Sequence, residues 1–476
     1  MANKMTFLLA PVAAAVLAAC AVGPNYHAPE TRAAEKFDGI EATYSTDAQK
    51  SEPAINAFWR SFADPTLERL VDEALKSNYD VRIALSRVEE ARALRRNSAF
   101  DLAPSLQASG GYTKTRVSLD QTLAGAPRST EYYDAGFDAV WELDFFGRVR
   151  RGVEAANAQL GAVQAAEQDA QVIVTAEVTR GYFELRGFQQ QLDVARRNVA
   201  NQQSTLDLAQ ARLDGGTGTE LDTSRAQAQL SATLGTIGPL EAAVARSIHR
   251  LSVLLGREPG ALRAELLPTQ DLPPLPGIVP VGDPAGLLRR RPDIRIAERQ
   301  LASATASIGV AVADLFPRVT FTGSTGYVAA NSGDLGDHGT DAYLIAPGIS
   351  WGIFDLGHVQ ARIAASKARQ QGAVLQYEKT VLGALEETED SLVTHARARD
   401  RLVHDEAAVK ASQTASSLAR VRYENGASDF LQVLDAERTL LESEDRLARS
   451  RTEAATSLIA VYKALGGGWE ASPHPN

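Results

Sequence analysis

The residue whose type and position predict covalent chemistry is Cys20, the single cysteine of this 476-residue chain. Lys4 precedes an apolar run over 7–16 that is too short to span a bilayer, and small or apolar residues occupy 17–19. This pattern is typical of a secretion signal that ends in a lipobox, where the cysteine thiol is acylated and becomes the first mature residue. We therefore predict a signal peptide over 1–19 and lipidation at Cys20.

The alternative is an ordinary secretion signal that happens to contain a cysteine. With one cysteine, the chain forms no internal disulfide and no cysteine metal cluster. Several acyl chains would anchor the protein firmly, whereas one alone binds a membrane only marginally. Ala21 follows the cysteine. An aspartate there is the usual signal for retention at the inner membrane, so its absence favours the outer membrane.

Nothing else in the sequence predicts catalysis, a bound metal or a cofactor. The histidines considered as ligands or bases are scattered and lack metal-ligand spacing: His249, His338, His358, His395 and His404. The glycines of 215–218 follow a helical pattern rather than a strand, which indicates a turn and not a phosphate loop. The acidic run 386–390 is typical of a solvated helix face. A formal net charge of −10 argues against a nucleic-acid partner.

The basic cluster at 289–291 has a functional and a structural interpretation. In the functional one, the three arginines bind an anion or a lipid headgroup. In the structural one, Pro292 opens a helix, as proline does at a first helical position, and the arginines pair with acidic residues nearby. We favour the structural interpretation.

The elements that position these residues include two helix–turn–helix units, over 211–227 and 421–438. Each turn carries residues that adopt the left-handed conformation at a helix end: Gly215 and Gly216 in the first, Asn425 and Gly426 in the second. Ser428 or Asp429 can cap the helix that follows the second turn.

The two units belong to a tandem duplication. Matching residues, such as Leu221 and Leu431, differ by 210 positions, and by 213 further upstream, so one copy has a slightly longer loop. A repeat of this size decides the architecture of the chain. We predict a first repeat over 61–256 and a second over 285–466.

Four segments, two in each repeat, alternate between apolar and polar residues: 105–115, 132–144, 318–328 and 342–354. One face is apolar and aromatic and the other acidic or small, as at Phe137 and Asp138. Each segment has the length of a tilted strand that crosses a bilayer. Four strands cannot close a barrel, and lipid does not tolerate an open edge, so we expect a barrel shared between copies. The alternative is two soluble hairpins, each packed on a helix.

Helices account for most of the remaining sequence. We predict short helices over 65–76 and 80–99 and long helices over 148–214, 219–255, 357–425 and 429–465. At about 1.5 Å per residue, the first long helix would extend for about 100 Å, which implies coiled-coil packing. Gly238-Pro239 predicts a kink or break near 238. The other segments are a lipidated extended stretch over 20–60, a proline-rich linker over 257–284 and a polar tail over 467–476.

Several of these segments resemble the lipidated outer-membrane efflux proteins, the OprM/NodT branch of the TolC-like outer-membrane factors. The similar motifs are Cys20–Tyr26, Leu287–Ile294, Phe316-Pro317, Trp351–Asp355 and Arg422–Ala436. The resemblance implies a mainly α-helical, internally duplicated chain with a transmembrane β-barrel. It also implies a homotrimer, in which a 12-stranded barrel continues into a long periplasmic α-helical barrel. A belt around the helices would contain the N-terminal segment, the linker and the C-terminal part.

The resemblance further implies a gate at the periplasmic helix tips. In this family the positions of Leu431 and Asp435 line the closed end of the tunnel, and threefold symmetry would turn them into rings. Tyr423 and Arg438 occupy positions similar to contacts that hold the tips together. The candidate gate partners in the first repeat are Leu221 and Arg225.

The function implied is a passive outer-membrane exit duct of a tripartite pump for small toxic compounds. A periplasmic adaptor would dock on the turns that contain Gly215, Gly216, Asn425 and Gly426. An inner-membrane transporter, of the resistance-nodulation-division type, would supply the energy. A type I protein-secretion duct or a metal-ion exporter is the alternative within the family. An alternative of a different class is a lipid-anchored coiled-coil structural protein, against which the two-faced strands argue.

Overall fold

The computed structural model of the chain describes residues 21–29, 36–38, 44–45, 55–121, 125, 127–277 and 279–469. The predicted signal peptide, Cys20 and residues 470–476 lie outside these ranges. The chain forms two compact units. One contains the start of the chain, Arg87–Gln164 and Arg295–Lys379, and the other contains Thr31–Ser86, Ala165–Ile294 and Thr380–Asn476.

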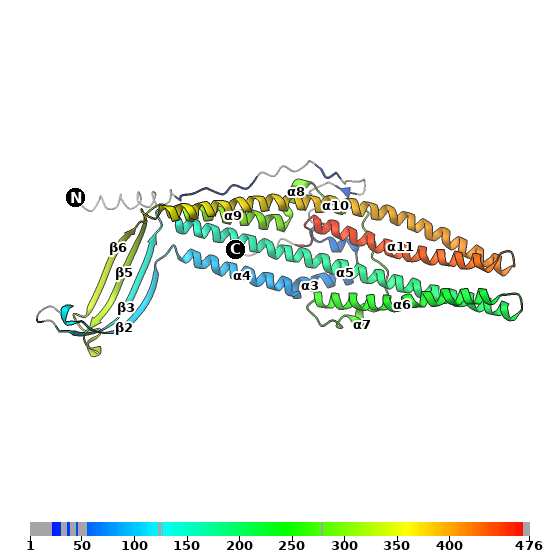
Figure 1. The fold of residues 1–476 in the computed structure, drawn as a ribbon, viewed down its shortest axis with the longest axis horizontal. Helices are drawn as coiled ribbons and strands as arrows, with labels where there is room; N and C mark the ends of the chain where they lie inside the picture. The colour runs from blue at the N-terminus through cyan, green and yellow to red at the C-terminus, as the bar shows by residue number, and fades with distance from the viewer. Residues whose placement is uncertain are drawn as a thin grey trace. The chain divides into compact units, whose positions relative to one another are not determined.

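The first unit contains a four-stranded antiparallel sheet. Its strands are β2 (Ser105–Arg116), β3 (Ser129–Leu143), β5 (Arg318–Ala329) and β6 (Asp341–Ser350), which lie side by side in that order (Figure 1). The 3-10 helices η2 (Leu119–Gln121) and η3 (Ser332–Asp334) follow β2 and β5. Each repeat supplies one hairpin, and β3 and β5 join the two hairpins.

The β3–β5 junction is held by a close approach of two glycines. Gly136 pairs with Gly326 across the junction. A Cβ on Gly326 would lie 2.3 Å from the Ala135 carbonyl oxygen, a distance that real Cβ atoms do not adopt. Glycine is therefore required for the two repeats to meet in this register.

The strand ends follow from their partners rather than from the alternating pattern. The predicted segment 342–354 is too long, because β6 ends at Ser350. Ser350 pairs with Arg318, the first residue of β5, so the residues beyond it have no neighbouring strand. Conversely, β3 begins before the predicted residue 132, since Ser129 pairs with Arg116 at the end of β2.

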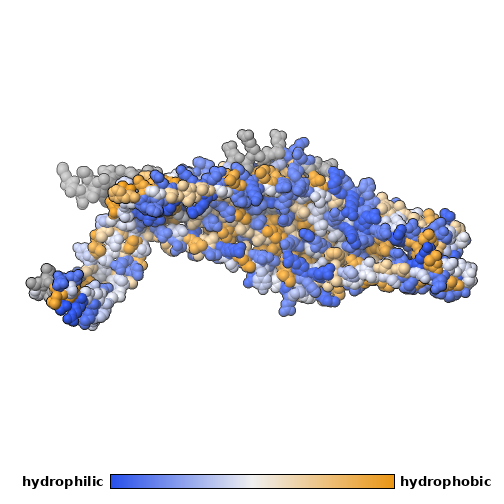
Figure 2. Space-filling view, viewed as in Figure 1, coloured by the Kyte–Doolittle hydropathy of each residue, from blue (hydrophilic) through white to orange (hydrophobic). Residues whose placement is uncertain are grey.

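Helices make up most of the rest of the chain. The longer ones are α3 (Pro65–Ser77), α4 (Tyr79–Phe100), α5 (Arg148–Asp214), α6 (Glu220–Leu254), α9 (Pro292–Ala313), α10 (Leu356–Glu424) and α11 (Phe430–Ala464). Hydrophilic and hydrophobic side chains are interspersed over the long helices on the face drawn in Figure 2. No helix in the described part of the chain has both the length and the apolar composition needed to cross a membrane.

The helix starts are defined by side-chain caps. Asp64 caps α3, accepting hydrogen bonds from the Thr66 and Leu67 amides at 2.8 and 3.0 Å. Thr219 and Asp222 form a reciprocal capping box at the start of α6. These caps satisfy amide groups that have no partner inside the helix.

Of the kink or break predicted near 238, the break is wrong, because α6 continues through Pro239 without interruption. The kink stays a prediction. Proline removes one helical hydrogen bond and leaves the carbonyl group of Gly235 without its usual partner. Gly235 and Pro239 are both exposed, so water can satisfy that carbonyl. The helix therefore tolerates a proline on its solvent side.

The linker is more structured than its proline content predicts. It contains α7 (Arg263–Leu266) and β4 (Val279–Pro280), the latter paired in parallel with β1 (Tyr44–Ser45). Leu262 and Leu266 are fully buried. Because these leucines enter the core, a segment expected to be wholly extended instead makes a helical turn.

The core of the second unit draws on distant parts of the chain. Phe58, in the 3-10 helix η1 (Phe58–Phe62), stacks on Tyr462 of α11 with ring centroids 4.8 Å apart. Phe62 meets Phe183 of α5 edge to face, also at 4.8 Å. Linker residues join the same buried cluster. This mixture of N-terminal, linker and C-terminal residues agrees with the belt that the resemblance implies.

Candidate functional site: the sheet and the helix tips

The sheet in the first unit has two chemically different faces. The register places apolar residues on one face: Leu106, Ala108, Tyr133, Ala135, Phe137, Ala139, Trp141, Val319, Phe321, Ile345 and Ile349. Phe137 is 63% exposed and Ile349 75% exposed, which is unusual for a water-soluble surface. The opposite face carries Asp134, Asp138 and Glu142, and Ser109 donates a hydrogen bond to Asp138 at 2.7 Å. One face suits lipid and the other water.

The two outer strands of this sheet are paired on one side only. In the described residues, β2 pairs with β3 alone and β6 pairs with β5 alone. Each outer strand therefore presents a row of unpaired backbone groups. Such a row is not tolerated in lipid, so the sheet needs further strands to close.

The helix tips in the second unit are two tight turns of the same kind. Gly216 and Gly426 have φ of 75° and 72°, the left-handed conformation that glycine adopts at low cost. The amide of Ala427 donates to the Arg422 carbonyl at 2.8 Å, which closes the second turn. Asp429, rather than Ser428, caps α11 by accepting from the Gln432 amide at 3.1 Å.

The two tips are joined through Arg212 and Tyr423. The guanidinium of Arg212 lies over the Tyr423 ring at 4.0 Å from its centroid. It also donates to the carbonyl oxygens of Tyr423 at 2.8 Å and Glu424 at 3.2 Å. Tyr423 is buried and packs on Phe430 with centroids 5.3 Å apart. A cation on the end of α5 thus holds the end of α10.

A second polar contact lies one turn deeper. Arg420 of α10 donates to Glu437 of α11 at 2.9 Å and to the Thr205 hydroxyl of α5 at 2.7 Å. Thr205 in turn donates to Glu437 at 2.8 Å. Glu437 is buried. The charge-assisted hydrogen bonds among Arg420, Glu437 and Thr205 join the three helices.

The predicted gate residues divide into two groups. Leu431 is 53% exposed, and Asp435 lies on the same face of α11, where it pairs with Arg438 at 2.9 Å. Tyr423, by contrast, is buried between the tips, where Arg212 donates to its carbonyl group. It is therefore not part of the exposed group that contains Arg438.

The candidate gate partners in the first repeat, Leu221 and Arg225, form no ion pair with Asp435 among the described residues. Leu221 and Arg225 are exposed on α6. Within the described chain, the ion pair of Asp435 is made with Arg438 and not with Arg225. A contact between Arg225 and Asp435 would therefore have to be made between copies.

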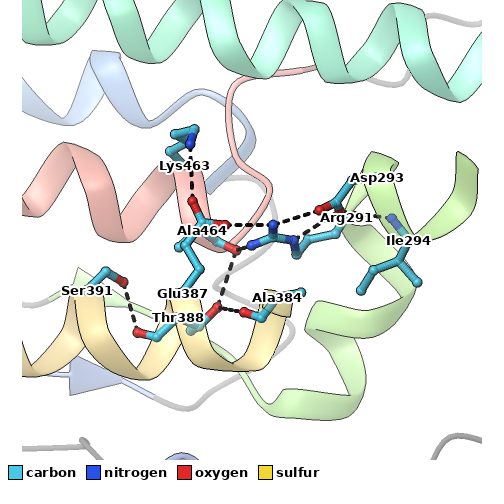
Figure 3. A network of polar contacts seen from close by, with 9 residues as sticks. All are labelled: Arg291, Asp293, Ile294, Ala384, Glu387, Thr388, Ser391, Lys463 and Ala464. Carbon is cyan, nitrogen blue, oxygen red and sulfur yellow. Dashed lines mark hydrogen bonds and ion pairs between the residues drawn. The ribbon is translucent and has the colours of Figure 1, made fainter. Parts of the chain in front are cut away.

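The arginine run is organised around Arg291 (Figure 3). Arg291 follows the short helix α8 (Pro284–Arg290) and is buried. It donates to the Ala464 carbonyl at 2.6 Å, to both oxygens of Asp293 at 3.1 and 2.8 Å, and to Glu387 at 2.7 Å. Lys463 donates to the other oxygen of Glu387 at 3.1 Å. Arg291 therefore binds the end of α11, the start of α9 and the side of α10, as the structural interpretation predicted.

The charged groups around Arg291 shift the pKa values of neighbouring carboxyl groups. Burial opposes the ionisation of Glu387, but its hydrogen bond from Arg291 and the charge of Lys463 outweigh this and lower the pKa of Glu387. Burial, with the neighbouring Asp293 carboxylate second, raises the pKa of Asp169. The cluster is a charged network centred on the buried Arg291, whose partners Asp293 and Glu387 remain partly exposed.

The contacts of Arg212, Arg420 and Glu437 were not among those predicted from the sequence. The duplication held a usable signal for the last two. Their counterparts 210 positions earlier are Gln210 and Gln227, so two glutamines correspond to an arginine and a glutamate. A joint change of this kind indicates a pair in contact. No group of three or more His, Cys, Asp or Glu placed to hold a metal ion occurs among the described residues.

Long helices combined with a two-faced antiparallel sheet define the fold of outer-membrane channels, which unite a β-barrel with a helical barrel. The solved structure of the outer-membrane channel OprN superposes with a TM-score of 0.89 at 40% sequence identity, covering 94% of this chain and 100% of that one. The fold class predicted from the sequence is confirmed.

The sequence matches the outer membrane efflux protein family over residues 70–257 and 284–467. The chain belongs to this family. It is 32% identical to the solvent efflux pump outer membrane protein SrpC of Pseudomonas putida, over 96% of this chain and 97% of that one. It is also 32% identical to the outer membrane protein OprJ of Pseudomonas aeruginosa, over 96% and 95%. The protein is thus an efflux channel of the outer membrane, and its relatives are efflux and channel proteins.

Proposed function

We propose that three copies of this chain form a passive duct through which small toxic compounds leave the cell. The observation that carries this proposal is the sheet with one lipid-type face, one acidic face and two unpaired edges. Membrane barrels need at least eight strands, so one four-stranded sheet requires at least one further copy. The number three, and with it a 12-stranded barrel, rests on the family resemblance.

The proposed duct is closed at the helix tips by Leu431 and Asp435. Both side chains are exposed on one face of α11, close to the tip that precedes this helix. Around a threefold axis, Leu431 would narrow the passage by apolar contact. Three Asp435 carboxylates would form a ring that attracts cations.

The proposed protein partners meet the duct at its periplasmic end. A periplasmic adaptor would bind the turns that contain Gly216 and Gly426, which are exposed. An inner-membrane transporter of the resistance-nodulation-division type would deliver substrate through that adaptor. A relative named for solvent efflux supports small molecules as substrates. Lipidation at Cys20 would add a second attachment to the outer membrane.

The test is the mass and conductance of the purified protein. Native mass spectrometry should give three copies per particle, and planar bilayers should show small, mostly closed channels. Replacing both gate residues, Leu431→Ala with Asp435→Ala, should raise conductance several-fold and sensitise cells to vancomycin. A dimeric mass would refute the trimer. Unchanged conductance at normal yield would remove the two residues from the gate.

The alternative ducts predict different cell phenotypes. A protein-secretion duct would leave a secreted protein inside cells that lack this chain, without changing their tolerance of solvents or dyes. A metal-ion exporter would change tolerance of metal salts alone. Deletion followed by growth on solvents, dyes and metal salts separates the three functions.

A further inference from the structure

A cavity of about 500 Å³ lies in the second unit, beneath the linker segment Asp271–Gly277. We call it the strap pocket. Its lining comes from that segment, from α5, from α10 and from α11: Gln190, Asp271–Gly277, His395, Arg399, Leu402, Val403, Glu406, Arg451 and Ala455. The volume is in the range of pockets that hold drug-sized organic molecules.

Most of the strap pocket wall is apolar. The linker contributes the run Leu272–Pro276, two leucines and three prolines, whose rings and methyl groups carry no hydrogen-bond donor. Leu402, Val403 and Ala455 add further apolar lining. Val403 is 65% exposed, so a large apolar side chain here faces open space. An apolar body bound in the pocket would cover this surface.

The charged groups of the strap pocket differ in how they are satisfied. Arg451 pairs with Glu406 at 3.4 Å, so these two offset each other. Arg399 has no hydrogen-bond or ion-pair partner in the described part of the chain, and its Nη1 atom is buried. A buried guanidinium nitrogen without an acceptor lowers the stability of the folded chain. Arg399 could therefore donate to a bound ligand.

The neighbours of Arg399 do not supply that acceptor. His395 is buried, and its Nδ1 lies 3.1 Å from the Ser457 hydroxyl. Burial first, and the charge of Arg399 second, lower the pKa of His395 to about 4, so it is neutral at pH 7. Asp271 begins the strap and also lines an adjoining cavity of about 350 Å³ with Asp193 and Glu444.

We propose that the strap pocket binds an amphipathic organic anion, with its carboxylate or sulfonate on Arg399 and its apolar body against the leucine and proline wall. Arg399 offers a planar pair of donors that matches such a group. The linker above would close over the bound body. This function is separate from the duct, since none of the predicted gate residues lines the pocket.

The experiment compares two dyes with the same apolar body. 1-Anilinonaphthalene-8-sulfonate carries the sulfonate, and N-phenyl-1-naphthylamine lacks it. Binding of each is measured by fluorescence titration on the full chain in nanodiscs, with empty nanodiscs subtracted. The variants are Arg399→Gln, Arg399→Lys and the matched control Arg397→Gln. Arg397 lies two residues away on α10, pairs with Asp400 and is absent from the pocket lining.

The expected result is selective for charge. Arg399→Gln should weaken binding of the sulfonate dye about tenfold or more, since a hydrogen bond to a charged group is lost, and should leave the neutral dye unchanged. Arg399→Lys should lose less, and Arg397→Gln nothing. Equal affinity of the sulfonate dye for Arg399→Gln and wild type would overturn the proposal. So would equal losses for both dyes.

A second pair of variants keeps the test valid if Arg399→Gln fails to fold. Val403 is exposed on the pocket wall, so its replacement leaves the core intact. Val403→Glu adds a negative charge and should repel the sulfonate dye several-fold more than Val403→Gln does. The neutral dye should bind both alike. Identical sulfonate-dye affinities for the two variants would refute an anion site here.

Discussion

At the scale of single residues, buried arginines organise this protein. Arg186 is fully buried and donates to Gln189, to Gln270 and to the Pro268 carbonyl, at 2.8, 2.6 and 3.1 Å. In the second repeat, Arg291 likewise donates to groups on three helices. A guanidinium carries several donors in one plane and stays charged, so it can join several backbone segments at once.

The first prediction concerns Arg291. Arg291→Gln would leave Asp293 and Glu387 without their shared cation and the Ala464 carbonyl without its donor. Breaking a buried pair costs about 3–5 kcal/mol, and the partial exposure of both carboxylates reduces this to about 2–3 kcal/mol. Thermal melting followed by circular dichroism should show a clear loss. Arg289→Gln is the control, because Arg289 is exposed, and its melting should match the wild type.

The second prediction concerns His395 and pH. Its pKa is about 4 in the folded chain and about 6.5 when unfolded. Between pH 4 and 6.5 the unfolded chain binds a proton at His395 that the folded chain does not. The contribution of His395 to the free energy of unfolding is therefore fully present above pH 6.5 and is lost as the pH falls toward 4. The loss is at most about 3 kcal/mol.

The pH effect of His395 is isolated by a matched variant. His395→Gln keeps a polar group near Ser457 but does not titrate. Melting temperatures of wild type and variant, measured from pH 7.5 to 4.5, should converge as the pH falls. A constant difference across this range would show that His395 titrates normally.

At the scale of elements, the helix tips depend on contacts that no local pattern reveals. Gly215 and Gly216 mark the turn in the sequence, but Arg212 reaches Tyr423, which lies 211 residues away. The cation–π contact and the charge-assisted hydrogen bond together contribute about 2–3 kcal/mol. Arg212 therefore contributes a large part of the contact between the two tips, beside the packing of Tyr423 on Phe430.

The third prediction tests this contact. Arg212→Ala should loosen the tips, raise single-channel conductance and increase sensitivity to vancomycin. Arg422 is the matched control, since it occupies the equivalent position of the second repeat. Within the described residues its hydrogen bond is to the Ala427 carbonyl of its own turn, at 3.4 Å. Arg422→Ala should change conductance little. Equal effects of the two substitutions would show that general loosening of the turns, and not the Arg212–Tyr423 contact, is responsible.

The ends and contacts of the helices and strands differ in how far the sequence predicts them. Alternation and turn glycines are local, so the expected helix over 357–425 and the observed α10, Leu356–Glu424, differ by one residue at each end. The end of β6 is not local, because it depends on where β5 begins. The continuity of α6 through Pro239 depends on exposure. The Arg212 and Arg420 contacts depend on how distant helices meet.

At the scale of the whole molecule, the residues that follow Cys20 are attached to the first unit. Arg151 is buried and donates to the Val22 carbonyl at 3.2 Å and to the Asn25 side chain at 2.8 Å. Gly23 approaches Gly309 so closely that a Cβ would lie 2.5 Å from the Gly309 Cα. A lipid on Cys20 would therefore be tied to α5 and α9 by a short, well-held segment.

The fourth prediction concerns that lipid. Cys20→Ala should abolish fatty-acid labelling in cells, because it removes the single thiol of the chain. The protein should remain in the outer-membrane fraction, since the sheet and the attached segment do not depend on acylation. Cys20→Ser is the conservative control and should behave identically. Labelling that persists in Cys20→Ala would rule out this acylation site.

The two unpaired edges of the sheet belong to different strands, β2 from the first repeat and β6 from the second. In the proposed trimer, β6 of one copy meets β2 of the next, and this head-to-tail contact closes a ring. A subunit damaged only at β6 still offers an intact β2 edge to its neighbour. Such a subunit would enter rings with normal subunits and leave them open. Alleles of this kind are therefore expected to be dominant, whereas alleles that prevent folding are recessive.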